Sequence, residues 1–303
     1  MSLAAFPFLA FFLTLGAVLA VVLDAVARSA LAGAPAGRYL AGPLRQAAMR
    51  LSGQLVTTEA PDRANWRLAP GWYGALAAAG LAVVPFDEGL ALVQLPTSIV
   101  LWGAVEALVV VVVFLHGWSP NAPFPLIGAY RYVATGLPVM LPSMFVLIGA
   151  ALPARSLDVL AIVESQREMW NVVRQPLGLP LLLIVGLSLT LRGPMDYADS
   201  ADLAGGSSAE DSGPARAMWQ AARLAMLVAF SAMAATVFLG GYLGPLLPGP
   251  LWLALKTALV LVLMVAATHL LPRMPVSRMV TFLWVVLLPI SFLHLLAAGL
   301  VAL

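Results

Sequence analysis

Pro96–His116 reads PTSIVLWGAVEALVVVVVFLH, an apolar run interrupted by one acidic side chain, Glu106. About 20 apolar residues in helical form cross the hydrocarbon core of a bilayer. The whole chain of 303 residues is built in the same way, because 62% of its residues are hydrophobic and 10% are charged. Soluble proteins carry about 25% charged residues. The composition therefore excludes a soluble fold and predicts a polytopic membrane protein.

Eight stretches of this kind are bounded by charges or by Pro and Gly. They are Leu3–Val26, Leu68–Phe86, Pro96–His116, Phe124–Leu152, Leu177–Leu191, Arg216–Gly240, Leu251–Leu271 and Met279–Leu303. Backbone polar groups must be paired within hydrocarbon, so each stretch is expected to be a helix. The sequence thus predicts an all-α fold with eight transmembrane helices in a single domain, residues 1–303.

The basic residues are distributed unequally between the two sides of these spans. Eleven lie in or beside the loops that follow odd-numbered spans: Arg28, Arg38, Arg45, Arg50, Arg63, Arg67, Arg192, Arg216, Arg223, Arg273 and Arg278. Only Arg155, Arg167 and Arg174 border the other loops. Because cytoplasmic loops are enriched in Lys and Arg, both termini are expected on the outer, periplasmic side.

Three segments outside the spans have distinct patterns. Residues 27–67 form a predicted cytoplasmic loop, in which Gly42–Val56 places apolar residues on one helical face, as an interfacial amphipathic helix does. Ser156–Trp170 is predicted to form a second amphipathic helix on the outer side. Residues 193–215 form an acidic cytoplasmic loop around the flexible stretch Gly205–Ser208.

Ionisable side chains inside the spans are candidates for function, because burying one costs about 2.5–3.5 kcal/mol on insertion scales. Glu106 lies near the middle of the third span, and Arg131 lies in the fourth span. If these two spans pack side by side, the two side chains are expected to form an ion pair. This pair would act as a structural salt bridge, as part of a proton or quinone path, or as the substrate site of a transporter.

Other charges lie nearer the membrane surfaces. Arg216, Gln220 and Arg223 are spaced i, i+4 and i+7, so all three share one helical face, which is predicted to contact something polar. Lys256 is expected to extend to the outer headgroups. Asp24 is expected to pair with Arg28, four residues later.

The chain has no cysteine and three histidines. The absence of cysteine excludes iron–sulfur clusters, disulfides and c-type haem from this chain, so redox metals must belong to partner chains. His116 and His269 are predicted near the cytoplasmic ends of spans and His294 toward the outer side. No haem or metal site is therefore expected, and nucleotide-binding or nucleic-acid-binding motifs are not found.

The carboxyl-terminal third carries several familiar strings. They are Ala235–Pro245 (ATVFLGGYLGP), Trp252–Lys256 (WLALK), Leu271–Arg273 (LPR) and Trp284–Pro289 (WVVLLP), and upstream Gly117–Trp118, Gly128–Ala129, Pro194–Asp196 (PMD) and Glu210–Gly213 (EDSG) follow the same order. Together they resemble the H-type membrane subunits of NADH-quinone oxidoreductase, which are the quinone-site membrane subunits of respiratory complex I, with relatives in membrane-bound hydrogenases. The resemblance covers nearly the whole chain and implies eight helices with both termini outside.

This resemblance implies a multi-pass subunit of a bacterial inner membrane that binds quinone and helps couple its reduction to proton translocation. The partners implied are iron–sulfur peripheral subunits, small membrane subunits and antiporter-like subunits. The residues expected to line or latch the quinone chamber are Asp196, Asp199, Asp202, Glu210 and Asp211 of the loop, with Arg216 and Arg223. Glu106 and Arg131 are expected to form an intramembrane charge path.

The chain also departs from the family pattern. Met140 and Arg223 stand where the family carries glutamates in spans four and six, whereas Glu106 stands where the family has a small residue. The loss of those carboxylates favours an alternative function, a membrane anchor for a hydrogenase or dehydrogenase module with reduced or lost proton coupling. A stand-alone transporter is a third class, but no internal repeat supports it.

Overall fold

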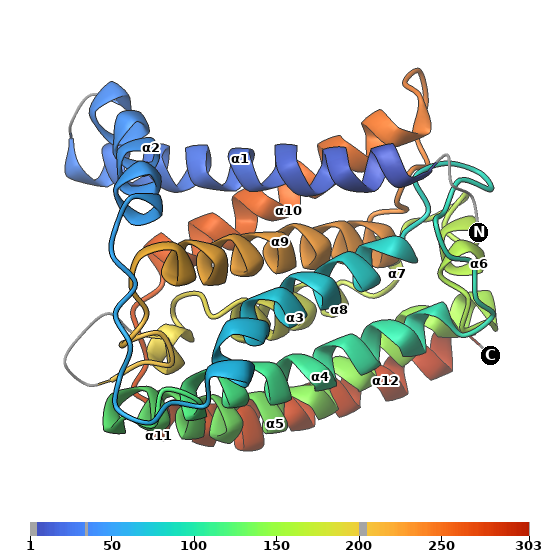
Figure 1. The fold of residues 1–303 in the computed structure, drawn as a ribbon. Helices are drawn as coiled ribbons and strands as arrows, with labels where there is room; N and C mark the ends of the chain where they lie inside the picture. Colours follow the sequence, from blue (N-terminus) through green and yellow to red (C-terminus); the bar gives the residue numbers. More distant parts are fainter. Residues whose placement is uncertain (1–4, 34–35, 200–204, 303) are drawn as a thin grey trace.

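The computed structural model describes residues 5–33, 36–199 and 205–302. It begins with the long helix α1 (Phe6–Ala32), which ends where Gly33 turns into the left-handed region at φ 60°. The following helix α2 (Ala36–Leu51) lies across the end of α1 (Figure 1). The remaining helical elements are α3 (Arg63–Ala82), α4 (Ser98–Trp118), α5 (Pro123–Ala151), η2 (Leu152–Ala154), α6 (Val159–Glu164), α7 (Asn171–Arg174), α8 (Gly178–Leu189), η3 (Asp196–Ala198), α9 (Gly213–Phe238), α10 (Gly249–Leu270), α11 (Val276–Phe282), the π-helical η4 (Leu283–Leu287) and α12 (Leu288–Ala302).

Within the described ranges, six helical segments are long and apolar enough to cross a membrane. They are α1, α4, α5 with η2, α9, α10 and the continuous run α11–η4–α12. The prediction of an all-helical polytopic membrane protein is confirmed. Two expected spans differ: α8 has only 12 residues, and α3 begins with Arg63 and includes Arg67 in its second turn.

Helix α9 is the centre of the bundle. In its most apolar window 78% of residues are buried, against 17% in α1, because α1, α3, α8 and α10 all pack around α9. Small residues permit close approach between these helices. A Cβ at Gly186 of α8 would lie 2.2 Å from the ring of Phe230 on α9, so only glycine allows this contact.

The two ends of the bundle differ. Helices α2 and η3 lie at one end, which we call the polar end, whereas the start of α1 and the end of α12 both lie at the opposite end (Figure 1). The polar end includes the described parts of the predicted acidic loop. This arrangement brings the loop against the amino-terminal turns of α9.

Both amphipathic helices differ from their predicted bounds. Helix α2 begins before Gly42 and ends at Leu51, where Ser52 and Gly53 form a turn. The helix expected over Ser156–Trp170 is restricted to the six residues of α6, so that prediction was wrong in extent. Asp158 caps α6 by accepting a hydrogen bond from the Leu160 N–H, and tertiary contacts replace further helix.

The expected position of Lys256 is also wrong. The side chain is buried rather than extended to headgroups, and its Nζ donates to the carbonyls of Gly241 and Leu243 at 3.0 and 2.6 Å. The ammonium also lies 4.4 Å from the ring centroid of Trp170. Lys256 thus satisfies the irregular backbone after α9, because carbonyl groups beyond the end of a helix lack intrahelical donors.

Candidate functional site

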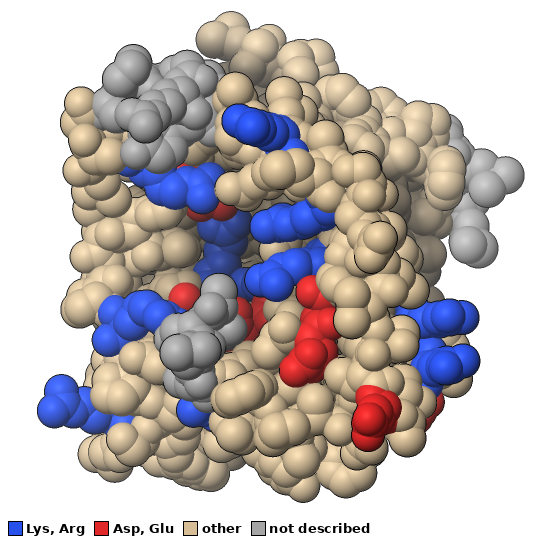
Figure 2. All heavy atoms as spheres, turned by 60° about the vertical axis from the view of Figure 1, so that its left-hand side comes forward, with Lys and Arg blue, Asp and Glu red and all other residues tan. Residues whose placement is uncertain are grey.

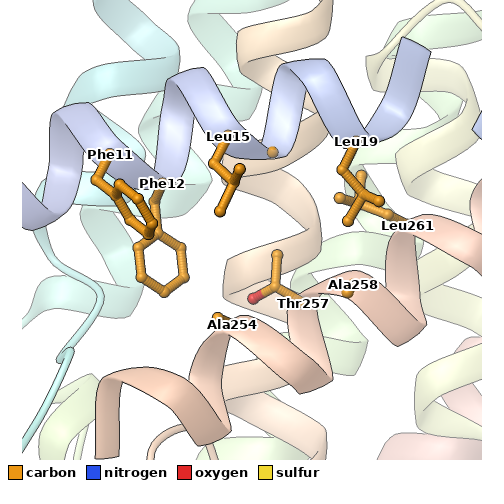
Figure 3. A pocket seen from close by; sticks show the side chains of 9 residues that line it. Phe11, Phe12, Leu15, Leu19, Ala254, Thr257, Ala258 and Leu261 are labelled. Carbon is orange, nitrogen blue, oxygen red and sulfur yellow. The ribbon is translucent and has the colours of Figure 1, made fainter. Parts of the chain in front are cut away.

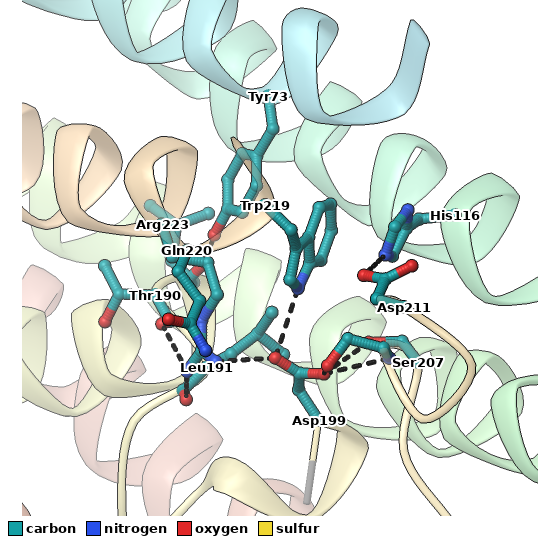
Figure 4. Close-up of polar contacts among 12 residues, drawn as sticks. Tyr73, His116, Thr190, Leu191, Asp199, Ser207, Asp211, Trp219, Gln220 and Arg223 are labelled. Carbon is teal, nitrogen blue, oxygen red and sulfur yellow. Dashed lines mark hydrogen bonds and ion pairs between the residues drawn. The ribbon is translucent and has the colours of Figure 1, made fainter. Parts of the chain in front are cut away.

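The first cluster of the polar end is centred on Asp199, whose side chain is 1% exposed. Its Oδ2 lies 2.5 Å from Nη1 of Arg223 and accepts a hydrogen bond from Trp219 Nε1 at 3.1 Å (Figure 4). Its Oδ1 accepts from Ser207 Oγ and from the N–H of Ser208. Burial alone raises the pKa of the Asp199 carboxyl, but Arg223 and these hydrogen bonds hold that pKa below its usual range.

Arg223 also holds the end of α8. Its guanidinium donates to the carbonyls of Thr190 and Leu191, where the helix has ended and Leu191 has a φ of 55°. These carbonyls would otherwise lack donors. The expectation that the face of Arg216, Gln220 and Arg223 contacts polar groups is therefore confirmed for Arg223, and also for Gln220, which accepts from Arg50.

The second cluster is centred on Asp211, which is buried just before α9. Its Oδ1 accepts from Trp66 Nε1 at 2.8 Å, and its Oδ2 lies 2.9 Å from Nε2 of His116. His116 and Asp211 are 1% and 0% exposed at their side chains. Two partners thus satisfy a carboxylate that would be costly to bury alone.

Trp219 joins the two clusters. Its indole stacks on the His116 ring with centroids 3.7 Å apart while its N–H donates to Asp199. Tyr73 of α3 lies beside the indole, with ring centroids 5.3 Å apart, and donates to the carbonyl of Leu189 at 2.6 Å. Figure 4 shows these side chains converging from α3, α4, α9 and the loop. They form a nearly continuous polar layer.

The other predicted loop residues are less enclosed. Asp196 is one-third exposed and pairs with Arg273 at 2.8 Å. Glu210 is half-buried, and no hydrogen-bond or ion-pair partner is seen for it in the described part of the chain. Asp202 lies outside the described residues. Arg216 lies one helical turn before Gln220, which accepts from Arg50 of α2, and Asp199 pairs with Arg223 instead.

The predicted ion pair between Glu106 and Arg131 does not form. Glu106 is buried and accepts hydrogen bonds from Trp102 Nε1 at 2.7 Å and Ser143 Oγ at 2.5 Å. Arg131 instead donates to the carbonyl of Gly205 at 3.1 Å, toward the polar end. A guanidinium that reaches the loop escapes the cost of burial, whereas the carboxyl is satisfied by local donors. A transporter site built on this pair therefore loses its basis.

A third cluster corrects the expectation for Asp24. Within the described residues, Arg28 donates to the backbone carbonyl of Asp24, at 3.2 Å, and not to its carboxylate. The Asp24 carboxylate instead accepts two hydrogen bonds from Arg192, at 3.0 and 2.8 Å, and lies 3.2 Å from His269 Nε2. A bidentate guanidinium binds a carboxylate more strongly than a single contact does. The cluster ties α1, the end of α8 and α10 together.

Sequence reasoning missed Trp66, Tyr73, His116 and Trp219 as members of the site. A signal was present, because each of these residues carries a polar group that must be satisfied when buried, and each lies near a predicted cytoplasmic helix end. Their partners are distant in sequence, so the signal alone did not assign them. In the described residues no three His, Cys, Asp or Glu side chains form a metal-binding group.

A small cavity is lined by Glu106, Tyr132 and Ser188 among apolar residues of α4, α5 and α8. An open apolar groove lies between α1 and α10 (Figure 3). Phe11, Phe12 and Thr257 are among its lining residues. Of these two, only the cavity contains an acidic side chain.

Residues 43–299 match the family model described as NADH dehydrogenase. The chain is 36% identical to an H-type NADH-quinone oxidoreductase subunit of Rhodopseudomonas palustris (strain HaA2), over 79% of this chain and 76% of that protein. It is 34% identical to an H-type subunit of the same enzyme from strain ATCC BAA-98 / CGA009, with the same coverage. It is 30% identical to the H-type subunit of Brevibacillus brevis (strain 47 / JCM 6285 / NBRC 100599), over 79% of this chain and 73% of that protein.

Proposed function

The chain belongs to the NADH dehydrogenase family, as its motifs predicted, and is a membrane subunit of an oxidoreductase complex; from this premise we propose that it forms the membrane side of a quinone chamber. Electrons would come from iron–sulfur clusters on a peripheral partner, since this chain has no cysteine. Small membrane subunits and antiporter-like subunits are the other proposed partners. The proposed location is the bacterial inner membrane.

We also propose that α3 and α8 complete eight crossings. The charge distribution supports a cytoplasmic polar end, because eleven arginines border the loops on this side and three border those on the other. The two ends of the chain would then both lie in the periplasm. Because α8 has only 12 residues, irregular backbone at its ends would lie at membrane depth. Such backbone is tolerated where surrounding protein buries it.

The observation that carries the proposal is the enclosure of Asp199 and Asp211 against α9. The chamber would lie between α1, α9 and this loop, with the layer of Arg223, Trp219 and Asp199 as its floor. Quinone reduction adds two electrons and two protons and builds negative charge on the quinone oxygens. A preorganised positive group such as the Arg223 guanidinium would stabilise such charge without reorganising. Asp196, Asp202 and Glu210 would lie along the loop, and Arg216 at the rim.

The buried Glu106 supports a route for protons away from this chamber. Its cavity is lined by Ser188 and Leu189, and the carbonyl of Leu189 accepts from Tyr73, which lies beside Trp219. A carboxyl at this depth can take up and release a proton, whereas the thioether of Met140 in the same cavity cannot. Glu106 would thus take the place of the family's glutamate in the fourth span, where this chain has Met140 on α5. Arg131 would act from the loop side, through Gly205.

Quinone reduction by the reconstituted complex tests the site. Arg223→Ala and Glu210→Ala are each expected to lower the rate, because they remove a floor residue and a loop acid. Glu88→Ala is the matched control, since Glu88 is an 80% exposed acid outside the polar end. Unchanged rates in Arg223→Ala and Glu210→Ala would overturn the assignment.

The second candidate is an anchor that docks an electron-transfer module without moving protons. The observation in its favour is that Glu106 has no charged partner among the described residues, so an extended carboxylate relay is not seen. Proton uptake by sealed vesicles during quinone reduction separates the two candidates. The anchor predicts reduction without acidification, and the coupled subunit predicts both.

A further inference from the structure

Two arginines of the polar end lie near each other, because Arg50 binds Gln220, which is one helical turn after Arg216. Arg50 lies in the last turn of α2 and Arg216 in the first turns of α9. Burial and the positive charge of Arg216 both lower the pKa of the Arg50 guanidinium. Arg50 Nη1 donates to the neutral amide oxygen of Gln220, and no carboxylate contacts Arg50 or Arg216 within the described residues. Within the described part of the chain, the two positive charges are therefore not paired with an acidic side chain.

The arrangement is fixed by backbone contacts. The N–H of Val56 donates to Ser212 Oγ at 2.7 Å, which joins the segment after α2 to the start of α9. Gly213, with a φ of 50°, lies so close to this segment that a Cβ would be 2.8 Å from the carbonyl oxygen of Gly53. The fold thus holds Arg50 beside Arg216 despite their repulsion. Such an arrangement calls for an anion between them.

Helix α2 exposes apolar side chains beside Arg50. Leu44 is 75% exposed, Leu51 is 64% exposed, and Met49 is also exposed. Helix α2 lies across the bundle direction at its end (Figure 1), the orientation of a helix in the membrane interface. On this end of the molecule Lys and Arg side chains, with Asp and Glu side chains among them, gather around a hollow (Figure 2). Exposed apolar side chains and the positive charge of Arg50 thus lie on the same helix.

We propose that this face binds an anionic phospholipid, with its phosphate between the guanidiniums of Arg50 and Arg216 and its acyl chains against Leu44 and Leu51. One molecule supplies both the anion and the hydrocarbon that the surface needs. Arginine is suited to this contact, since its planar fork binds two phosphate oxygens at once. The site lies on the α2 side of α9 and shares Arg216 with the rim of the proposed quinone chamber, but Arg50 and its lipid contacts lie outside that chamber.

The test counts lipids retained by the complete complex. The complex is exchanged into nanodiscs of phosphatidylcholine mixed equally with phosphatidylglycerol, and native mass spectrometry then counts the phosphatidylglycerol that stays bound. We expect the wild type to retain it and Arg50→Gln to reduce retention about tenfold, which corresponds to about 1.4 kcal/mol. Arg45→Gln is the matched control, because Arg45 is exposed on the same helix, and it should retain the lipid.

Arg50→Lys keeps the charge, so it is expected to retain most of the lipid even if Arg50→Gln fails to assemble. Equal retention in Arg50→Gln and Arg45→Gln would overturn the proposal, as would equal retention of the two lipids by the wild type. Phenylglyoxal modification of Arg50 distinguishes a protein occupant. If Arg50 stays protected in the intact complex after complete delipidation, an acidic group of a neighbouring subunit covers it, and the lipid assignment is wrong.

Discussion

The imidazole of His116 and the indole of Trp219 lie face to face, with ring centroids 3.7 Å apart and an interplanar angle of 12°. His116 binds Asp211, and Trp219 binds Asp199. This stack therefore connects the two buried carboxylates of the polar end. A change on one side of the stack is expected to alter the position of the other carboxylate.

Trp219→Phe tests the hydrogen bond from Trp219 to Asp199 separately from the ring stack on His116. Phenylalanine keeps an aromatic face for His116 but cannot donate to Asp199, and loss of a hydrogen bond to a charged group costs about 1.5–3 kcal/mol. We expect lower thermal stability of the solubilised complex and slower quinone reduction. Trp118→Phe, at a half-exposed indole of α4, is the control. Equal behaviour of the two variants would contradict the role given to Trp219.

Asp199 and Arg223 are expected to be strongly coupled. Removing one member of a buried pair costs about 3–5 kcal/mol, and we expect the lower end because the Arg223 side chain is 22% exposed. Asp199→Asn, Arg223→Gln and the double variant form a double-mutant cycle, measured by chemical denaturation. Additive effects of the two single changes would show that the contact contributes little.

His116 and Asp211 should act as one unit. Asp211→Asn removes the buried charge yet leaves an amide that Trp66 can still donate to, so it is expected to destabilise less than His116→Ala, which leaves the carboxylate with one partner. In the double variant the cost is expected to fall below that of His116→Ala alone. Protease sensitivity of the loop before α9 reports these differences. A larger loss in Asp211→Asn would contradict the ranking.

The pH dependence of the loop follows from the lowered pKa of Asp199. A carboxyl whose folded pKa is below its unfolded value of about 3.9 contributes stability above that pH, and loses it as the pH falls through the folded pKa. The Asp199 contacts should therefore persist from neutral pH to about pH 4. Limited proteolysis across this range should leave the loop uncleaved. Cleavage that begins near pH 6 would argue against a lowered pKa of Asp199.

Glu106→Gln separates proton movement from electron transfer. The amide can still accept from Trp102, so folding is expected to survive, but it cannot carry a proton. Vesicle acidification should be lost while quinone reduction continues. Ser143→Ala, which keeps the carboxyl, is expected to retain acidification. Undiminished acidification in Glu106→Gln would remove this residue from the proton route.

Local patterns predicted part of the site correctly. The spacing of Arg216, Gln220 and Arg223 placed them on one polar-facing side of α9, because helical periodicity depends only on neighbouring residues. The same reasoning failed for Asp24, whose carboxylate binds Arg192, 168 residues away, rather than the nearby Arg28. It failed likewise for Glu106 and Lys256, whose partners depend on how helices pack.

The sequence by itself determined that this protein is a helical membrane protein of the NADH dehydrogenase family, since apolar length, charge distribution and motif order can be read along the chain. Only the tertiary structure decided that Asp211 meets His116, 95 residues away, and that Trp219 joins it to Asp199. The physical reason is that a buried charge must find donors wherever the folded chain supplies them. Those donors come from helices that are adjacent in space but distant in sequence.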